Sequence, residues 1–284
     1  MELVREPIGV GLVYPREREE IEELLREAFT SLQRGAREPP RGVGRVLAYI
    51  VPHGLLRDIA GVAAAAYQAL NVTKDVETFV LVGPNHSGRG ALVAVYPGGV
   101  WVTPLGTARV DEEFAMELVS VDDYAELDDE AHEEEYSLEL QLIFLQYLLG
   151  ERFRFVAVSI ADMANPEIAL SLAKSIAATS RALGRGIAVI ATSEVGYYPS
   201  PSDAGKAVSM VKECIRDMDH ECFYRVVRLY NVYLCAPAAL ATATSYSRII
   251  GADTARAEIV GETMRSNELG QYAPYFSAIL YQVS

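Results

Sequence analysis

Two histidines occupy equivalent places in this sequence, each shortly after an apolar run. Residues 46–51 lead through one proline to His53, and residues 79–82 lead through Gly-Pro-Asn to His86. A buried strand of a parallel sheet has such a continuous apolar run because helices cover both its faces, and a proline ends it since proline cannot donate to the ladder. Ligands of open α/β sheets bind beyond the carboxyl ends of the strands, so the two imidazoles are candidates for one shared site. The alternative is two unrelated loop histidines, each with its own hydrogen bonds.

Two further side chains could join such a site. Glu194 follows the apolar run 187–191, and Cys235 lies just before a predicted helix over residues 237–250, where backbone N–H groups and the helix dipole favour a thiolate. Two imidazoles with a carboxylate suit non-haem iron, whereas a thiolate shifts the preference toward copper(I) or zinc. Because these residues come from distant parts of the chain, their spacing alone leaves a metal site as one possibility.

The elements that must position these side chains alternate between strand and helix. Such alternation predicts an α/β fold in a single domain over residues 1–284, with a central mixed, mostly parallel sheet and helices on both faces. A Pro-Gly-Gly sequence at residues 97–99 predicts a hairpin between residues 91–96 and 100–102. Further predicted strands cover residues 153–160, 187–191, 257–260 and 276–282, and the main predicted helices cover residues 16–32, 58–70, 137–145, 165–183, 202–218, 221–229 and 237–250.

The composition excludes several classes of protein. The 284 residues carry a formal net charge of −14, much of it in the acidic stretch 122–135, so a nucleic-acid backbone would be repelled. No apolar run is long enough to span a bilayer, and the first residues are too polar for a signal peptide, so no membrane partner is expected. The odd number of cysteines, without a Cys-x-x-Cys pair, predicts a cytoplasmic protein without a disulfide framework, with Cys214 and Cys222 as core or boundary residues.

Several short motifs together resemble one known family. The chain resembles the Memo family, whose fold is similar to that of the class III extradiol dioxygenases. The motifs occur in the family's order, and the resemblance continues more weakly to the C-terminus. They are Gly11-Leu12-Val13-Tyr14-Pro15, Val51-Pro52-His53, Val62-Ala63-Ala64, Gly83-Pro84-Asn85-His86, Thr103-Pro104-Leu105-Gly106, and His132 with Ser137-Leu138-Glu139-Leu140-Gln141-Leu142.

The resemblance implies a metal-binding pocket and assigns its residues. If the family's ligands are transferred to the matching positions of this sequence, the metal ligands are His53, His86 and Cys235, and the implied metal is iron or copper. His132, Glu194 and Tyr197 are expected around an open coordination position, with Tyr136 as a further pocket residue. The alternative for His132, which lies in the acidic stretch, is a surface histidine with a raised pKa.

Two departures from the family pattern bear on activity. Tyr136 stands where the family usually has a histidine, and residues 193–197 read Ser-Glu-Val-Gly-Tyr where the family has Ser-Asp-x-x-His. Tyrosine is a poor general base at neutral pH because its unperturbed pKa is near ~10. The resemblance therefore favours a protein that binds a metal, small molecule or peptide with weakened or lost dioxygenase-like activity. The alternative is an active metal-dependent oxidoreductase, and a serine hydrolase is disfavoured because the Gly-x-Ser-x-Gly elbow is missing.

Overall fold

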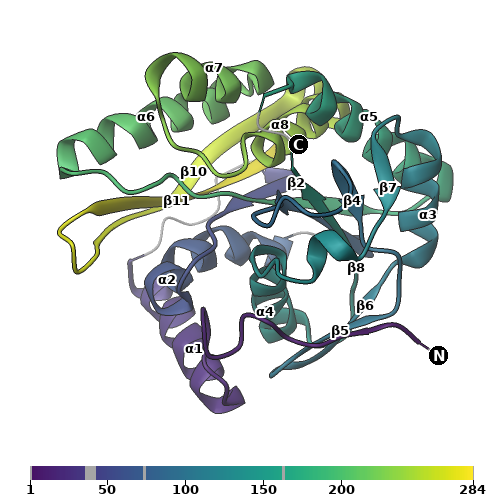
Figure 1. Cartoon of the computed structure of the whole chain (residues 1–284), viewed down its shortest axis with the longest axis horizontal. Helices are drawn as coiled ribbons and strands as arrows, with labels where there is room; N and C mark the ends of the chain where they lie inside the picture. The colour runs from purple at the N-terminus through teal and green to yellow at the C-terminus, as the bar shows by residue number, and fades with distance from the viewer. Residues whose placement is uncertain (1, 36–42, 73–74, 162–163, 284) are drawn as a thin grey trace.

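A computed structural model of the chain describes residues 2–35, 43–72, 75–161 and 164–283. Within these residues, one mixed sheet of eleven strands runs through the centre of the molecule, with helices on both of its faces (Figure 1). The strands are β1 (Val4–Arg5), β2 (Val43–Val51), β3 (Thr78–Pro84), β4 (Val93–Val95), β5 (Val100–Thr103), β6 (Gly106–Val110), β7 (Ala125–Leu127), β8 (Arg154–Ile160), β9 (Ile187–Thr192), β10 (Ala255–Ser266) and β11 (Tyr272–Val283).

The centre of the sheet consists of the continuous apolar runs. β3 pairs in parallel with β8 on one side and β9 on the other, and β9 pairs in parallel with β2. Every residue of β3 and β9 is buried, as the uninterrupted apolar sequences predict. The order of the main path is β1-β5-β6-β8-β3-β9-β2-β11-β10, and β4 and β7 branch from β8. The antiparallel hairpin β10–β11 extends one side of this parallel centre.

Helices cover the sheet on both faces because successive strand residues alternate between them. In β3, Val80 and Val82 belong to one core and Phe79 and Leu81 to the other. The first core is closed by α3 (Glu112–Val121), α5 (Pro166–Leu183), α6 (Pro201–Asp217), α7 (His220–Tyr230) and α8 (Pro237–Gly251). The second core is closed by α1 (Arg18–Gly35), α2 (Leu56–Tyr67) and α4 (Ser137–Leu149). The predicted α/β fold is thereby confirmed.

The hairpin predicted around residues 97–99 is wrong. β4 pairs with β7 and β8, and β5 pairs with β6 and β1, so β4 and β5 are not partners. Gly99 has a positive φ of 80° and lies against the Leu3 carbonyl, to which the Val100 N–H donates a hydrogen bond of 2.9 Å. The glycines therefore allow the close approach of another chain segment rather than forming a tight turn. The hairpin actually lies one strand later, where Thr103 pairs with Gly106.

The cysteine count also led to a wrong expectation. Cys214 near the end of α6 and Cys222 in the first turn of α7 form a disulfide, with their Cα atoms 5.4 Å apart. Met218 adopts the left-handed conformation between the two helices, which folds α7 back against α6 and brings the cysteines together. Cys235 is the free, buried cysteine of the described chain. Among the described segments, every helix is too short or too polar to span a lipid bilayer.

Removing this disulfide should lower the free energy of unfolding. The bridge closes a loop with a sequence separation of 8, and the loss of chain entropy in the unfolded state corresponds to about 2–3 kcal/mol. The double variant Cys214→Ser, Cys222→Ser should therefore unfold at lower urea concentration than oxidised wild type. Reduced wild type serves as the control, since it should behave like the variant. Equal unfolding midpoints for oxidised wild type and variant would rule out this contribution.

Candidate metal centre

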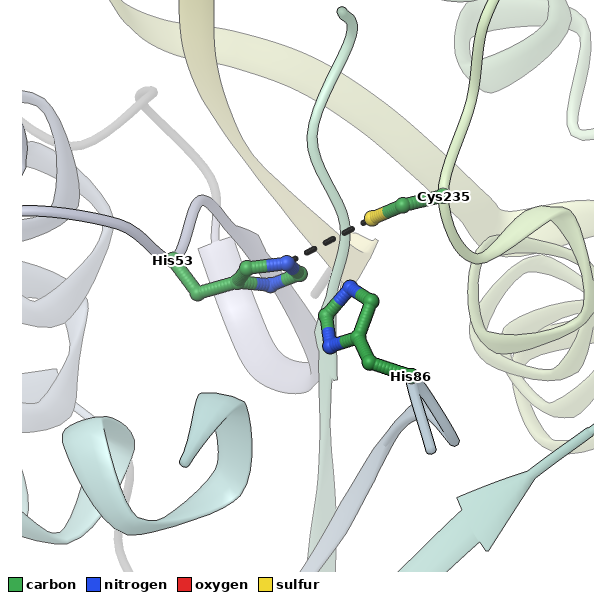
Figure 2. Close-up of side chains that lie close together, drawn as sticks. All are labelled: His53, His86 and Cys235. Carbon is green, nitrogen blue, oxygen red and sulfur yellow. Dashed lines mark hydrogen bonds between the residues drawn. The ribbon is translucent and has the colours of Figure 1, made fainter. Parts of the chain in front are cut away.

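The side chains of His53, His86 and Cys235 converge at the carboxyl edge of the parallel strands. One potential ligand atom from each residue lies within 4.8 Å of the others. The two imidazole rings and the sulfur face one another in Figure 2, and the Cys235 Sγ is 3.4 Å from Nε2 of His53. His53 follows β2 and His86 follows β3, and both strands are parallel neighbours of β9. Their carboxyl ends therefore meet at the same edge of the sheet.

Cys235 reaches this edge because its loop is tied to the end of β9. Leu234 forms an isolated bridge with Val195, and the Cys235 N–H donates a hydrogen bond of 3.1 Å to the Glu194 carbonyl. The sulfur in turn accepts a hydrogen bond of 3.0 Å from the Glu194 N–H. α8 begins two residues later, so its N-terminal dipole also favours a negative sulfur.

Outer partners fix the orientation of both imidazole rings. Nδ1 of His53 hydrogen-bonds with Oγ1 of Thr192 at 2.9 Å, and Gln141 donates both to that oxygen and to the Pro52 carbonyl. Nδ1 of His86 lies 3.0 Å from a Glu135 carboxylate oxygen, and the His86 backbone N–H donates to the same carboxylate at 2.8 Å. With both Nδ1 atoms engaged, the Nε2 atoms are the ones left for a shared ligand.

The electrostatics of the three residues are strongly coupled. Burial lowers the pKa of His53, but the negative Cys235 sulfur more than reverses this effect, so the pKa is raised overall. The pKa of His86 is raised to about 10 by its hydrogen bonds to Cys235 and Glu135. Burial raises the pKa of Cys235, yet the two imidazoles and the Glu194 N–H lower it to about 5. Each imidazole therefore favours the thiolate form of Cys235, and the negative sulfur in turn favours the protonated form of each imidazole.

Glu135 is a site residue that the sequence reasoning missed. It is buried, and although burial raises the pKa of its carboxyl, the hydrogen bonds from His86 and Ser137 lower it to about 2. The sequence reasoning counted it only as the end of the acidic stretch. A usable signal was its position directly before Tyr136 and the predicted buried helix over residues 137–145, where the chain enters the core.

Tyr136 and Glu194 flank the cluster. The Tyr136 ring centroid lies 6.4 Å from that of His53 and 6.2 Å from that of His86. Burial and the nearby carboxylates raise the pKa of Tyr136 to about 12. The Glu194 carboxylate covers Gly54, where a Cβ would meet Oε1 at 2.6 Å, and Gly54 has a positive φ of 130°. Burial raises the pKa of Glu194 to about 7, against the lowering effect of the two imidazoles.

Tyr197 lies farther out. Its side chain is 53% exposed, and its described hydrogen-bond partner is Tyr275 rather than either histidine. Tyr275 lies near Glu194, since a Cβ on Gly54 would be 3.7 Å from the Tyr275 hydroxyl and 2.6 Å from Oε1 of Glu194. Tyr197 therefore belongs to the rim of the site, while the ring of Tyr136 lies against the two candidate ligand histidines.

His132 is neither a surface residue nor a member of the cluster. It is fully buried, its Nε2 hydrogen-bonds with the Ala94 carbonyl at 3.2 Å, and its ring packs edge-on against Tyr96 and Trp101. Burial lowers the pKa of His132 to about 4, contrary to the raised value expected for a histidine in an acidic stretch. None of its described ring contacts is with a cluster residue, so the structure does not bring it to the open side of the site.

The neutral state of His132 should make the fold sensitive to acid. The native state keeps this ring neutral down to about pH 4, whereas the unfolded chain binds a proton below about 6.5, so the stability present above pH 6.5 is lost as the pH falls through this window. The loss from this residue is on the order of 3 kcal/mol. His132→Gln retains a donor for Ala94 but cannot titrate, so its unfolding free energy should depend less on pH. Urea titrations of both proteins at pH about 7 and about 4 measure the difference, and parallel pH dependences would contradict it.

Comparisons with known proteins place the chain in a family. A family model described as Memo-like protein matches residues 5–272. A MEMO1 family protein of Desulfurococcus amylolyticus is 32% identical over 272 residues, 95% of each chain, and one of Pyrococcus abyssi is 34% identical, covering 88% of this chain and 89% of the relative. The crystal structure of an uncharacterised protein from Escherichia coli K12 superposes with a TM-score of 0.57 at 16% identity, over 83% of this chain and 100% of that one, which supports the fold alone. The chain therefore belongs to the Memo-like protein family.

Proposed function

We propose that this Memo-like protein binds one metal ion, iron or copper, through His53, His86 and Cys235. The observation that carries the proposal is that potential ligand atoms of these three residues lie within 4.8 Å of one another. His53 and Cys235 are buried, while His86 is 38% exposed, so the cluster is accessible from the side of His86. A small molecule or peptide would reach the metal from that side.

The chemistry of the donor set fits a metal ion. A ligating imidazole is usually oriented by an outer hydrogen-bond partner on its second nitrogen, often a carboxylate. Glu135 is such a carboxylate for His86, and the hydroxyl of Thr192 holds the second nitrogen of His53. The thiolate form of Cys235 is already favoured by the surrounding hydrogen bonds. A thiolate with two imidazoles suits iron, copper or zinc, so zinc is the main competitor in any metal analysis.

Within this proposal, the protein binds ligands with weakened or lost dioxygenase-like activity. A bound iron or copper would supply redox chemistry, but the chain must also move a proton beside it. Tyr136 lies next to both imidazoles, and its raised pKa of about 12 keeps the phenol protonated at neutral pH. It therefore cannot accept a proton as a histidine at that position would.

One observation favours the alternative of an active metal-dependent oxidoreductase. The Glu194 carboxyl has a raised pKa of about 7, so near neutral pH it can both accept and release a proton beside the cluster. If Glu194 takes over this role, oxygen consumption with catechol-type compounds should depend on it. Loss of such activity in Glu194→Gln, with metal content unchanged, would support the alternative.

Metal analysis tests the proposal directly. The protein should contain close to one iron or copper ion per chain, or take one up on addition. It is purified both with and without oxygen, because oxygen changes the oxidation state of iron and copper and thereby their retention by a thiolate site. His53→Ala and His86→Ala should lose this metal. His220→Ala is the matched control, since His220 lies at the start of α7 outside the cluster. Wild-type protein that neither contains nor takes up a metal would refute the proposal.

We also propose a cytoplasmic location, with neither nucleic acid nor a membrane as a partner. The net charge of −14 supports this, because it opposes binding to phosphate backbones and anionic lipids. The Cys214–Cys222 disulfide does not decide the compartment, because some intracellular proteins, notably those of hyperthermophiles, also carry disulfides. Fractionation of cells that express the native chain tests the location.

A further inference from the structure

Arg5, in β1 near the start of the chain, is buried against the segment that leads into α4. Its side chain is 7% exposed, and its guanidinium lies 3.9 Å from the centre of the Trp101 ring. It donates hydrogen bonds of 3.1 and 2.9 Å to the His132 carbonyl and one of 2.9 Å to the Glu135 carbonyl, and it forms an ion pair with the buried Glu139 carboxylate. One side chain thus joins three points of residues 132–139, more than 120 positions away in the sequence.

Arg5 holds the backbone segment that presents Glu135 and Tyr136 to the candidate metal centre. The Glu135 carbonyl is bound to Arg5, while the Glu135 carboxylate holds both the ring and the backbone N–H of His86. The next residue, Tyr136, places its ring beside both imidazoles. A shift of this backbone would therefore move the partner that orients His86.

Glu139 extends the connection to the rest of the N-terminal segment, residues 5–14, which we name the N-terminal strap. The Glu139 carboxylate accepts hydrogen bonds from the backbone N–H groups of Ile8 (3.0 Å) and Gly9 (2.8 Å) and from the hydroxyl of Tyr14. At the end of the strap, the Val13 carbonyl accepts a hydrogen bond of 2.7 Å from the Leu56 N–H, three residues after His53. The strap therefore contacts both the segment that follows His53 and the segment, residues 132–139, that supports His86.

We propose that Arg5 is a positioning residue for the metal centre, and that docking of the N-terminal strap and metal occupancy favour each other. This inference rests on the proposed metal site. Arg5 touches no candidate ligand and acts through Glu135. Outer partners of metal-ligating histidines typically contribute about 10- to 100-fold to metal affinity, and the loss of Arg5 should misplace such a partner. Coupling of this kind is reciprocal, so bound metal must strengthen docking of the strap by the same factor.

Cobalt(II) titration of purified protein tests the role of Arg5. Arg5→Met should weaken cobalt binding by about tenfold and alter the thiolate-to-cobalt absorption, because His86 is no longer held in place. The matched control is Arg185→Met. Arg185 is 21% exposed, pairs with Asp111 and Glu113, and lies beyond the opposite end of β3, where Asp111 also binds the hydroxyl of Thr78. This control should keep wild-type cobalt affinity and absorption even though it also loses a partly buried ion pair.

Hydrogen exchange in wild-type protein tests the coupling without any substitution, in case Arg5→Met does not fold. The Ile8 and Gly9 amides exchange when the strap undocks locally. Cobalt should therefore slow their exchange by about tenfold. The amides of Asn267 and Gly270 in the β10–β11 turn should keep their rates. Unchanged cobalt affinity in folded Arg5→Met, or unchanged exchange of the strap amides, would overturn the inference while leaving the metal site intact. Failure of wild type to bind cobalt, iron or copper would instead refute the proposed metal site.

Discussion

Replacing Cys235 by serine should reduce metal affinity by more than about 100-fold, which exceeds the usual effect of losing an outer partner. The substitution removes one of three candidate ligands and the only thiolate, on which the preference for iron, copper or zinc over harder ions depends. The hydroxyl of serine remains protonated at neutral pH and is a poor ligand for these metals. Competition titration against a chelator of known affinity, with metal content measured after dialysis, gives the size of the loss.

The other two cysteines provide the control for this variant. Cys214→Ser, Cys222→Ser removes two sulfur atoms rather than one, but from a disulfide between α6 and α7 that does not belong to the cluster. Its metal affinity should equal that of wild type even though its unfolding free energy is lower. Retention of full metal affinity by Cys235→Ser would show that the sulfur is not a ligand.

Tyr136→His should raise oxygen consumption with catechol-type compounds, by about 100-fold if the new imidazole acts as a general base. The wild-type phenol has a pKa raised to about 12, so it cannot accept a proton at neutral pH. The substitution introduces a group that titrates near neutrality, within ring-contact distance of both candidate ligand histidines. Oxygen-electrode traces with metal-loaded protein, compared at equal metal content, measure the gain.

Tyr197→His is the matched control, because Tyr197 is the other tyrosine that the resemblance to the family places at a histidine position. Its exposed side chain is hydrogen-bonded with Tyr275 rather than with the cluster. Its effect should be much smaller than that of Tyr136→His, and the double variant should resemble the single Tyr136→His variant. Rapid turnover by wild type, with no gain in either variant, would mean that these tyrosines do not mark reduced catalytic capacity.

The sequence alone was sufficient to predict the elements with the strongest local signals. The apolar runs within β2, β3, β8 and β9 were recognisable because a strand covered on both faces has a nearly continuous apolar sequence. The helix predicted over residues 165–183 matches α5, because helix ends are determined by nearby residues. Asn165 caps its first turn by accepting a hydrogen bond from the Glu167 N–H, and Gly184 ends it in the left-handed conformation. The convergence of His53 and His86 followed from their positions after parallel strands, because the carboxyl ends of such strands meet at one edge.

Only the tertiary structure determined which distant side chains meet the site. Glu135 was one carboxylate among many in an acidic stretch, and its burial against His86 follows from how residues 128–135 pack against the loop after β3. His132 was separated from the cluster by the same packing, which places its ring against Trp101. The Cys214–Cys222 disulfide depended on the angle between two helices, and the role of Arg5 depended on a contact with residues 132–139. Periodicity and capping report interactions between near neighbours in the chain, whereas these contacts depend on how whole elements pack, which no local pattern encodes.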